Sequence, residues 1–257
     1  MQIEGRNSVI ELLRSNHDIK KVMLEEGINR DDKIEQMIKL MQPRHLSITW
    51  TPKKKLNWMS QTQNHQGVIA EAVVKAKSIQ DYLEKVSFAD SELMSMGKSS
   101  QIPAHKLIYI REAQLEDNAG AIARSAEVFG LDGIVLQPKH AISPQLFRTS
   151  AGALAHVEII QESLYSAISA LKRANWNIVG IEVNTDTYYY DAPLTGDTLF
   201  IIGGEDKSLS TELTDKCDTI VKIPMHGKIN SLNMSVAAAI VMAESARQES
   251  VVNAKRK

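Results

Sequence analysis

The chain has 257 residues, of which 43% are hydrophobic and 24% charged, with a formal net charge of -1, as in an ordinary soluble globular protein with room for two domains. No apolar run approaches the roughly 18 residues of a membrane span, and the segment MQIEGRNSV lacks a signal-peptide core, so we expect a cytoplasmic protein without membrane contact. The single cysteine, Cys217, excludes an intrachain disulfide and a cysteine-rich zinc site, and the seven histidines show no ligand spacing, so no metal is expected.

The first 75 residues alternate between helical and extended patterns, which predicts a small α/β domain. One helix is expected at 7–15, and a second carries apolar residues at helical spacing, namely Ile34, Met37, Ile38 and Met41. Strands are expected at 20–26, 45–49 and 67–74, and a short segment follows Pro52.

This front segment is mildly basic. Residues 1–75 hold 12 Lys and Arg against 9 Asp and Glu, whereas residues 105–257 hold 15 against 18. Lysine clusters at 20–21 and 53–55, together with Trp58, are suited to phosphate contact and base stacking. A solvated charged surface is the alternative interpretation.

A connector is expected at 76–104, helical in its first part and turn-rich at GKSSQIP. From residue 105 onward strands and helices alternate again, which predicts a mostly parallel sheet covered on both faces. The predicted strands are LIYI, GIVLQ, HVEII, WNIVGIEV, TLFIIGG and TIVKIP, and the predicted helices are AGAIARSAEVFG, SLYSAISALKRA, SLSTELTDKC and LNMSVAAAIVMAESARQ.

Polar loops that contain glycine follow three of these strands: REAQLEDNAGAIAR after LIYI, GGEDKS after TLFII, and PMHGKINSLN after TIVKI. Parallel sheets bind ligands outside the carboxyl ends of their strands, so these loops are the candidate site. The chain contains no dinucleotide-binding G-x-G-x-x-G after the first strand, no P-loop and no G-x-S-x-G nucleophile motif.

Three motifs in these loops together resemble those of the SpoU/TrmH-type 2′-O-ribose RNA methyltransferases of the SPOUT superfamily. They are N-x-G-x-x-x-R at Asn118, Gly120 and Arg124, IIGGE ending at Glu205, and I-P-M followed by S-L-N-x-S at 231–235. The likeness covers residues 105–250. The front domain, which ends in HQGVIAEA, resembles the ribosomal-protein-like RNA-binding domain of the branch that methylates a guanosine ribose in 23S rRNA.

The resemblance implies an α/β protein with an RNA-binding domain at 1–75, a linker at 76–104 and a catalytic domain at 105–257. The C-terminal part of the mostly parallel sheet would form a deep trefoil knot. S-adenosyl-L-methionine would be the methyl donor, rRNA the partner, and two subunits of a homodimer would build each active site.

The same resemblance assigns roles to individual residues. The cofactor-binding positions are Gly203, Ile223, Met225 and Leu232, and the catalytic positions are Arg124, Asn118, Glu205, Ser231 and Asn233. A glycine at 203 lets the flat adenine approach the backbone closely. Capping of the following helix is the structural alternative for Asn118 and for the group Asn230, Ser231 and Asn233. First-turn placement beside a helix dipole is the alternative for Glu205.

Methylation needs a ribose hydroxyl, a poor nucleophile at neutral pH, to be deprotonated or oriented by a neighbouring group. The resemblance gives this task to Arg124. Because a guanidinium stays protonated in proteins, two roles are open for Arg124: a base, or a clamp on the target phosphate that orients the hydroxyl.

Two departures from the family pattern bear on this assignment. The family usually has Asp-Pro shortly before the first motif's asparagine, where this chain has 115–117 as Leu-Glu-Asp, and Asp206 and Ser208 replace two glycines of the second motif. Loss of these two glycines implies either a weaker affinity for S-adenosyl-L-methionine or a differently shaped loop. A tRNA target and a non-catalytic RNA-binding ribosome-assembly factor with the same fold are the alternatives.

Overall fold

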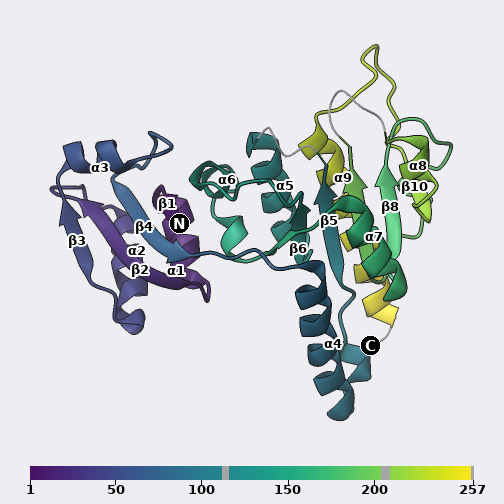
Figure 1. Ribbon diagram of the computed structural model, residues 1–257, viewed down its shortest axis with the longest axis horizontal. Coiled ribbons are helices and arrows are strands. Elements are labelled where there is room, and N and C mark those ends of the chain that lie inside the picture. Colours follow the sequence, from purple (N-terminus) through teal and green to yellow (C-terminus); the bar gives the residue numbers. More distant parts are fainter. Residues whose placement is uncertain (112–115, 204–208, 256–257) are drawn as a thin grey trace. The chain divides into compact units, whose positions relative to one another are not determined.

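The computed structural model describes residues 1–111, 116–203 and 209–255. The chain forms two compact units (Figure 1). The first unit comprises residues 1–75, 115–124 and 141–157, and the second comprises residues 76–114, 125–140 and 158–257. The domain boundaries expected from the sequence stay a prediction.

The first unit contains a four-stranded mixed sheet in the order β1-β4-β2-β3. Its strands are β1 (Gln2–Glu4), β2 (Asp18–Glu25), β3 (Ile48–Thr51) and β4 (Val68–Val73). The central strand β4 pairs antiparallel with β1 and β2, whereas β2 and β3 are parallel. The strands predicted at 20–26 and 67–74 are confirmed, whereas the one predicted at 45–49 begins three residues later, at Ile48. β1 has only three residues, too few positions for a periodic signal.

Three helices accompany this sheet: α1 (Arg6–Arg14), α2 (Asp32–Met41) and α3 (Lys53–Met59). The side chain of Asp31 caps α2 by accepting from the Ile34 amide at 3.1 Å, and Ile34 and Met37 are buried as their spacing predicts. The segment after Pro52 proves to be helix α3. Proline fits just before a helix because it lacks the amide that would otherwise be unpaired there.

The first unit also contains α6 (Pro144–Thr149), the 3-10 turn η3 (Ala153–Ala155) and the first part of α5 (Glu116–Val128). The sequence pattern predicted no helix at α6. Its start is nevertheless well defined, because Ser143 accepts from the Leu146 amide at 3.0 Å and Pro144 occupies the first helical position.

The second unit contains a six-stranded sheet in the order β10-β8-β9-β5-β6-β7, and every neighbouring pair is parallel. This confirms the predicted parallel sheet. Its strands are β5 (Lys106–Ile110), β6 (Gly133–Leu136), β7 (Glu158–Gln161), β8 (Asn177–Ile181), β9 (Thr198–Ile202) and β10 (Thr219–Val221), and its helices include α4 (Ile79–Ser95), α7 (Leu164–Arg173), α8 (Thr211–Thr214) and α9 (Met234–Lys255).

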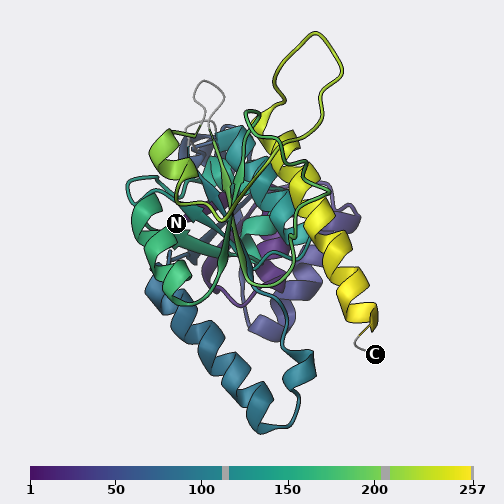
Figure 2. The ribbon, with the colours of Figure 1, turned by 90° about the vertical axis from the view of Figure 1, so that its right-hand side faces the viewer.

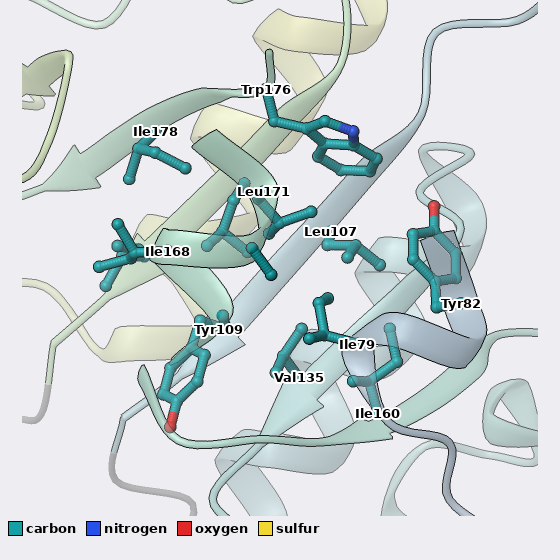
Figure 3. Close-up of a cluster of buried hydrophobic side chains, with 14 of the residues drawn as sticks. Ile79, Tyr82, Leu107, Tyr109, Val135, Ile160, Ile168, Leu171, Trp176 and Ile178 are labelled. Carbon is teal, nitrogen blue, oxygen red and sulfur yellow. The ribbon is translucent and has the colours of Figure 1, made fainter. Parts of the chain in front are cut away.

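Helices cover both faces of this sheet. On one face, Ile79 and Tyr82 of α4 and Leu171 of α7 pack on Leu107 and Tyr109 of β5 in one hydrophobic cluster (Figure 3). The other face carries α9, so α9 lies on one side of the sheet and α4 and α7 on the other (Figure 2). Burial on both faces explains why the strands read as nearly continuous apolar runs.

A buried lysine ties α9 to the sheet. Nζ of Lys106 donates to the carbonyl of Leu194 and to Oγ of Ser245, both at 2.8 Å, and lies 3.2 Å from the Glu249 carboxylate. Burial lowers the pKa of Lys106, and the charge of Glu249 opposes that shift. The ammonium therefore has three oxygen partners, which a buried charge requires.

Two features are absent from the described part of the chain. No helix in that part is long and apolar enough to cross a membrane. No group of three or more His, Cys, Asp or Glu residues among the described positions could hold a metal ion. The trefoil knot that the resemblance implies stays a prediction.

Candidate active site

The register of the parallel sheet aligns the ends of four strands along one edge. Ile202 of β9 pairs with Ile110 of β5 on one side and with Ile181 of β8 on the other, and Ile181 pairs with Val221 of β10. Neighbouring strands lie about 4.8 Å apart, so the residues that follow these four positions leave the sheet side by side. The three motif-bearing loops therefore start from one edge, as the sequence analysis expected.

The loop after β9 begins with Gly203, which is half-buried and follows Ile202 directly. A glycine here leaves the backbone at the strand end open to a flat ligand. Glu205, the acidic residue of the second motif, lies outside the described residues, as do Asp206 and Ser208.

The loop after β10 supplies the third motif. Ile223 and Met225 are half-buried, whereas residues 226–233 are exposed, and Leu232 retains 41% of its accessible surface. Figure 2 shows this segment between β10 and α9 reaching beyond the sheet. Gly203 directly follows β9, and Ile223 lies two residues past the end of β10, with β8 between the two strands.

Asn233, rather than Ser231, caps the last helix. α9 begins at Met234, and Oδ1 of Asn233 accepts from the amide of Ser235 at 2.8 Å and from its hydroxyl at 2.6 Å. The expectation that Ser231 caps this helix is wrong, because Ser231 stands three residues before the first helical residue and is exposed. Ser231 is thus a loop residue, and Asn233 combines a structural task with its predicted catalytic one.

The first motif lies on α5. This helix starts at Glu116, three residues before the predicted start, so Asn118 is a residue of its first turn and the capping interpretation of Asn118 is wrong. Arg124 is exposed although its neighbours Ala123 and Ala126 are fully buried. Asn118 and Arg124 belong to the first unit, and the other described candidate residues belong to the second.

Two cations next to the aligned edge were not selected from the sequence. Arg111 directly follows β5; its amide donates to the carbonyl of Ile202 at 3.3 Å, and its Nη1 is buried without an acceptor among the described residues. Lys222, directly before Ile223, places Nζ 4.9 Å from the ring centroid of Tyr188. Each of these two residues directly follows a strand, and that position is the feature of the sequence that could have identified them.

Tyr109 and Cys217 of the second unit are titratable but unsuited to proton transfer at neutral pH. Burial raises the pKa of Tyr109 to about 12, and the hydroxyl of Tyr109 donates to the carbonyl of Glu162 at 3.1 Å. Burial also raises the pKa of Cys217 to about 11, and its thiol donates to the carbonyl of Leu213 at 3.4 Å. Both groups stay protonated and act in packing.

Comparison with known families gives two matches along the chain. The SpoU rRNA Methylase family matches residues 105–243, and the family described as RNA 2′-O ribose methyltransferase substrate binding matches residues 2–76. An uncharacterized tRNA/rRNA methyltransferase of Mycolicibacterium smegmatis is 32% identical over 247 residues, which are 95% of this chain and 75% of that protein. A protein of Staphylococcus aureus assigned to the TrmH family of tRNA/rRNA methyltransferases is 28% identical over 249 residues, with 96% and 95% covered.

Solved structures with the same fold cover nearly the whole chain. An RNA 2′-O ribose methyltransferase superposes with a TM-score of 0.75 at 22% identity, covering 96% of this chain and 88% of that one. The SpoU methyltransferase AviRb from Streptomyces viridochromogenes, in complex with the cofactor AdoMet, superposes with a TM-score of 0.74 at 20% identity, covering 96% and 89%. At these identities the likeness establishes a shared fold. The N-terminal part of that fold, residues 2–76, is the part that matches the substrate-binding family.

Proposed function

Because the chain belongs to the SpoU rRNA Methylase family, an RNA methyltransferase family, we propose that it transfers a methyl group from S-adenosyl-L-methionine to a ribose 2′-hydroxyl of RNA. The favoured target is a guanosine of large-subunit rRNA. The observation that carries the proposal is the single sheet edge from which the second- and third-motif loops depart, at Ile202 and Val221.

The residues at this edge fit the cofactor. Gly203 has no side chain to cover the backbone after Ile202, and Ile223 and Met225 are half-buried apolar side chains just past the end of β10, two strands away. Adenine is flat and apolar on its faces, so the backbone of Gly203 and Ile223 would hold it, with Met225 and Leu232 as apolar walls. When bound, the cofactor supplies an electrophilic methyl group on a sulfonium.

The chain's own residues have to position the ribose. Arg124, exposed on α5, presents a planar fork of donors that suits a phosphate or a ribose oxygen. The ribose oxygen would gain the methyl group as the methyl–sulfur bond breaks and leaves a neutral thioether, and it would lose its proton to Arg124 or to water. Arg124 either assists that loss or clamps the neighbouring phosphate so that the oxygen is held in line. Asn118, Glu205, Ser231 and Asn233 complete the polar surroundings in this proposal.

A homodimer belongs to the same proposal, together with the trefoil knot. Exposed apolar side chains gather along the third-motif loop and the first turns of α9: Ile229 is 77% exposed, Leu232 41% and Val236 46%. A second copy of the chain would cover them. Sedimentation velocity should then give twice the mass of the chain, whereas a monomer at micromolar concentration would contradict the dimer.

The activity is tested with purified protein, tritiated S-adenosyl-L-methionine, and either naked 23S rRNA, assembled large subunits or total tRNA. A methylated 2′-oxygen blocks alkaline cleavage, so radioactivity should appear in alkali-resistant dinucleotides from rRNA. Label in tRNA alone would assign the alternative target, which the names of the relatives also allow. If calorimetry detects no binding of S-adenosyl-L-methionine at millimolar concentration, a non-catalytic RNA-binding assembly factor is favoured instead.

A further inference from the structure

Helix α3 presents an aromatic side chain and two lysines on one face. Trp58 is 84% exposed, and Lys54 and Lys55 precede it by four and three residues. Residues at these spacings are neighbours on a helix surface, with β-carbons about 5 to 6 Å apart. An indole face and two ammonium groups therefore meet solvent together.

The helix that carries them is firmly held. Leu56 is fully buried with Met23 and Ile69, and Nε2 of Gln2 donates to the carbonyl of Met59 at 3.0 Å. Nδ1 of His65 accepts from the Gly67 amide at 2.9 Å, which leaves Nε2–H to donate to Oδ1 of Asn57 at 2.7 Å. The backbone of α3 at Trp58 is therefore held in place by the contacts of its neighbours.

The turn after α3 is fixed as well. The buried Glu4 carboxylate accepts from the hydroxyl of Ser60 and the amide of Gln61, both at 2.7 Å. Burial alone would raise the pKa of Glu4, but hydrogen bonds from Ser60, Thr62 and Gln61 outweigh it and lower the pKa. A charged, fully bonded carboxylate thus anchors the end of the helix.

Folding does not explain the composition of this face. Three lysines occupy the first turn of α3, where the helix dipole disfavours positive charge. Lys53 is offset by Glu25 at 3.5 Å, but Lys54 and Lys55 form no ion pair with any residue that the structure describes. An arrangement unfavourable for the free protein becomes favourable when an anion binds.

We propose that this face binds one unpaired nucleotide of the RNA, with the base stacked on Trp58 and the adjoining phosphates against Lys54 and Lys55. That the ligand is RNA rests on the proposed function. Base stacking on an aromatic side chain requires a free base face, which loops, bulges and single strands offer and a duplex does not. The front segment therefore selects RNA with an unpaired nucleotide.

The other exposed tryptophan of this unit gives a matched control. Trp50 is 41% exposed and pairs in register with Leu24, whereas the neighbouring Met23 faces α3, so Trp50 lies on the opposite face of the sheet. The guanidinium of Arg30 lies 5.6 Å from the Trp50 ring centroid and occupies it as a cation–π partner. Trp50 is therefore not part of the α3 face.

The test measures binding of the full-length protein to two labelled RNAs: a hairpin with a purine-rich single-stranded loop, and a fully paired duplex of equal length. Trp58→Ala should weaken loop binding about tenfold, as loss of one base stack predicts. Trp58→Phe should retain part of the affinity, and Trp50→Phe all of it. Lys54→Gln with Lys55→Gln should lower the slope of log affinity against log salt by about 1 to 2.

Loop RNA should also quench tryptophan emission in the wild type and in Trp50→Phe, but far less in Trp58→Phe. Equal affinity of the wild type and Trp58→Ala for the hairpin, or equal affinity of the wild type for hairpin and duplex, would overturn the inference. If methyl transfer to RNA proceeds in that case, the proposed function stands without it. If Trp58-dependent loop binding is present but no RNA is methylated, only the proposed function fails.

Discussion

Gly120 of α5 and Thr149 of α6 lie so close that a β-carbon at position 120 would stand 2.0 Å from Oγ1 of Thr149 and 2.6 Å from its β-carbon. The Thr149 hydroxyl also donates to the carbonyl of Glu116 at 2.9 Å, which fixes it against the first turn of α5. The glycine of the first motif is thus a packing residue that lets two helices meet.

Gly120→Ala should destabilise the protein by about 1 to 2 kcal/mol. The steric clash costs about 2 to 3 kcal/mol, the upper part of the usual range because the added carbon would stand 2.0 Å from Oγ1, and the better helix propensity of alanine returns about 1 kcal/mol. Urea unfolding measures the difference. Adding Thr149→Ala should recover part of the loss, whereas Gly227→Ala, where the nearest atom is 4.0 Å away, should change stability little. Full stability of Gly120→Ala would contradict this packing.

Arg124→Lys should reduce methyl transfer at least about 100-fold while leaving the melting temperature unchanged. Lysine keeps the charge but loses the two-pronged donor geometry, and the side chain is exposed, so stability does not depend on it. Single-turnover methylation of rRNA is the measurement. Arg173→Lys on α7, also exposed, serves as the control and should behave as wild type. Wild-type rates for Arg124→Lys would refute both roles proposed for this residue.

Substitutions at Asn233 should separate capping from catalysis. Asn233→Ala removes the acceptor for the Ser235 amide and should lower stability by about 1 kcal/mol. Asn233→Asp keeps an acceptor, adds a charge that a helix start favours, and should remain as stable as wild type. If the amide also serves the reaction, both variants lose methyl transfer. Full activity of the stable Asp variant would restrict Asn233 to its structural task.

His105 should make stability depend on pH. Its Nδ1 lies 3.3 Å from Asp132 and its Nε2 3.3 Å from Asp90 of α4. Burial alone would lower the pKa of His105, but hydrogen bonds and charge attraction from Asp132 and Asp90 outweigh it and raise the pKa to about 9. The imidazolium thus joins the start of β5 to the start of β6 and to α4.

Because the pKa is raised on folding, the contribution of His105 is fully present below about pH 6.5, its value in the unfolded chain, and is lost as the pH rises to about 9. Wild-type stability should fall by roughly 2 to 3 kcal/mol across this range relative to His105→Gln, which lacks the titration. Urea unfolding at a series of pH values measures the difference. Parallel curves for the two proteins would exclude a raised pKa at His105.

The local pattern of apolar and polar residues was sufficient to predict most helices and strands. The four inner strands of the second unit, β5, β6, β8 and β9, are buried almost throughout, so their apolar runs could be recognised without knowing their neighbours. The helix after Pro52 and the strand at 2–4 were missed because seven and three residues hold less than two full periods of a signal. α6 was missed for the same reason, since it has six residues.

For the candidate site, too, one part of the arrangement could be predicted from the sequence and another part could not. The sequence by itself predicted three polar, glycine-containing loops after parallel strands, because the spacing of apolar residues indicates where strands and helices begin and end. Only the tertiary structure placed β9 between β5 and β8, aligned Ile110, Ile202 and Val221 on one edge, and gave the cap of α9 to Asn233 instead of Ser231. Strand order, register and helix starts depend on which backbone groups become hydrogen-bond partners, whether near or far along the chain. The spacing of residue types in the sequence does not show which groups pair.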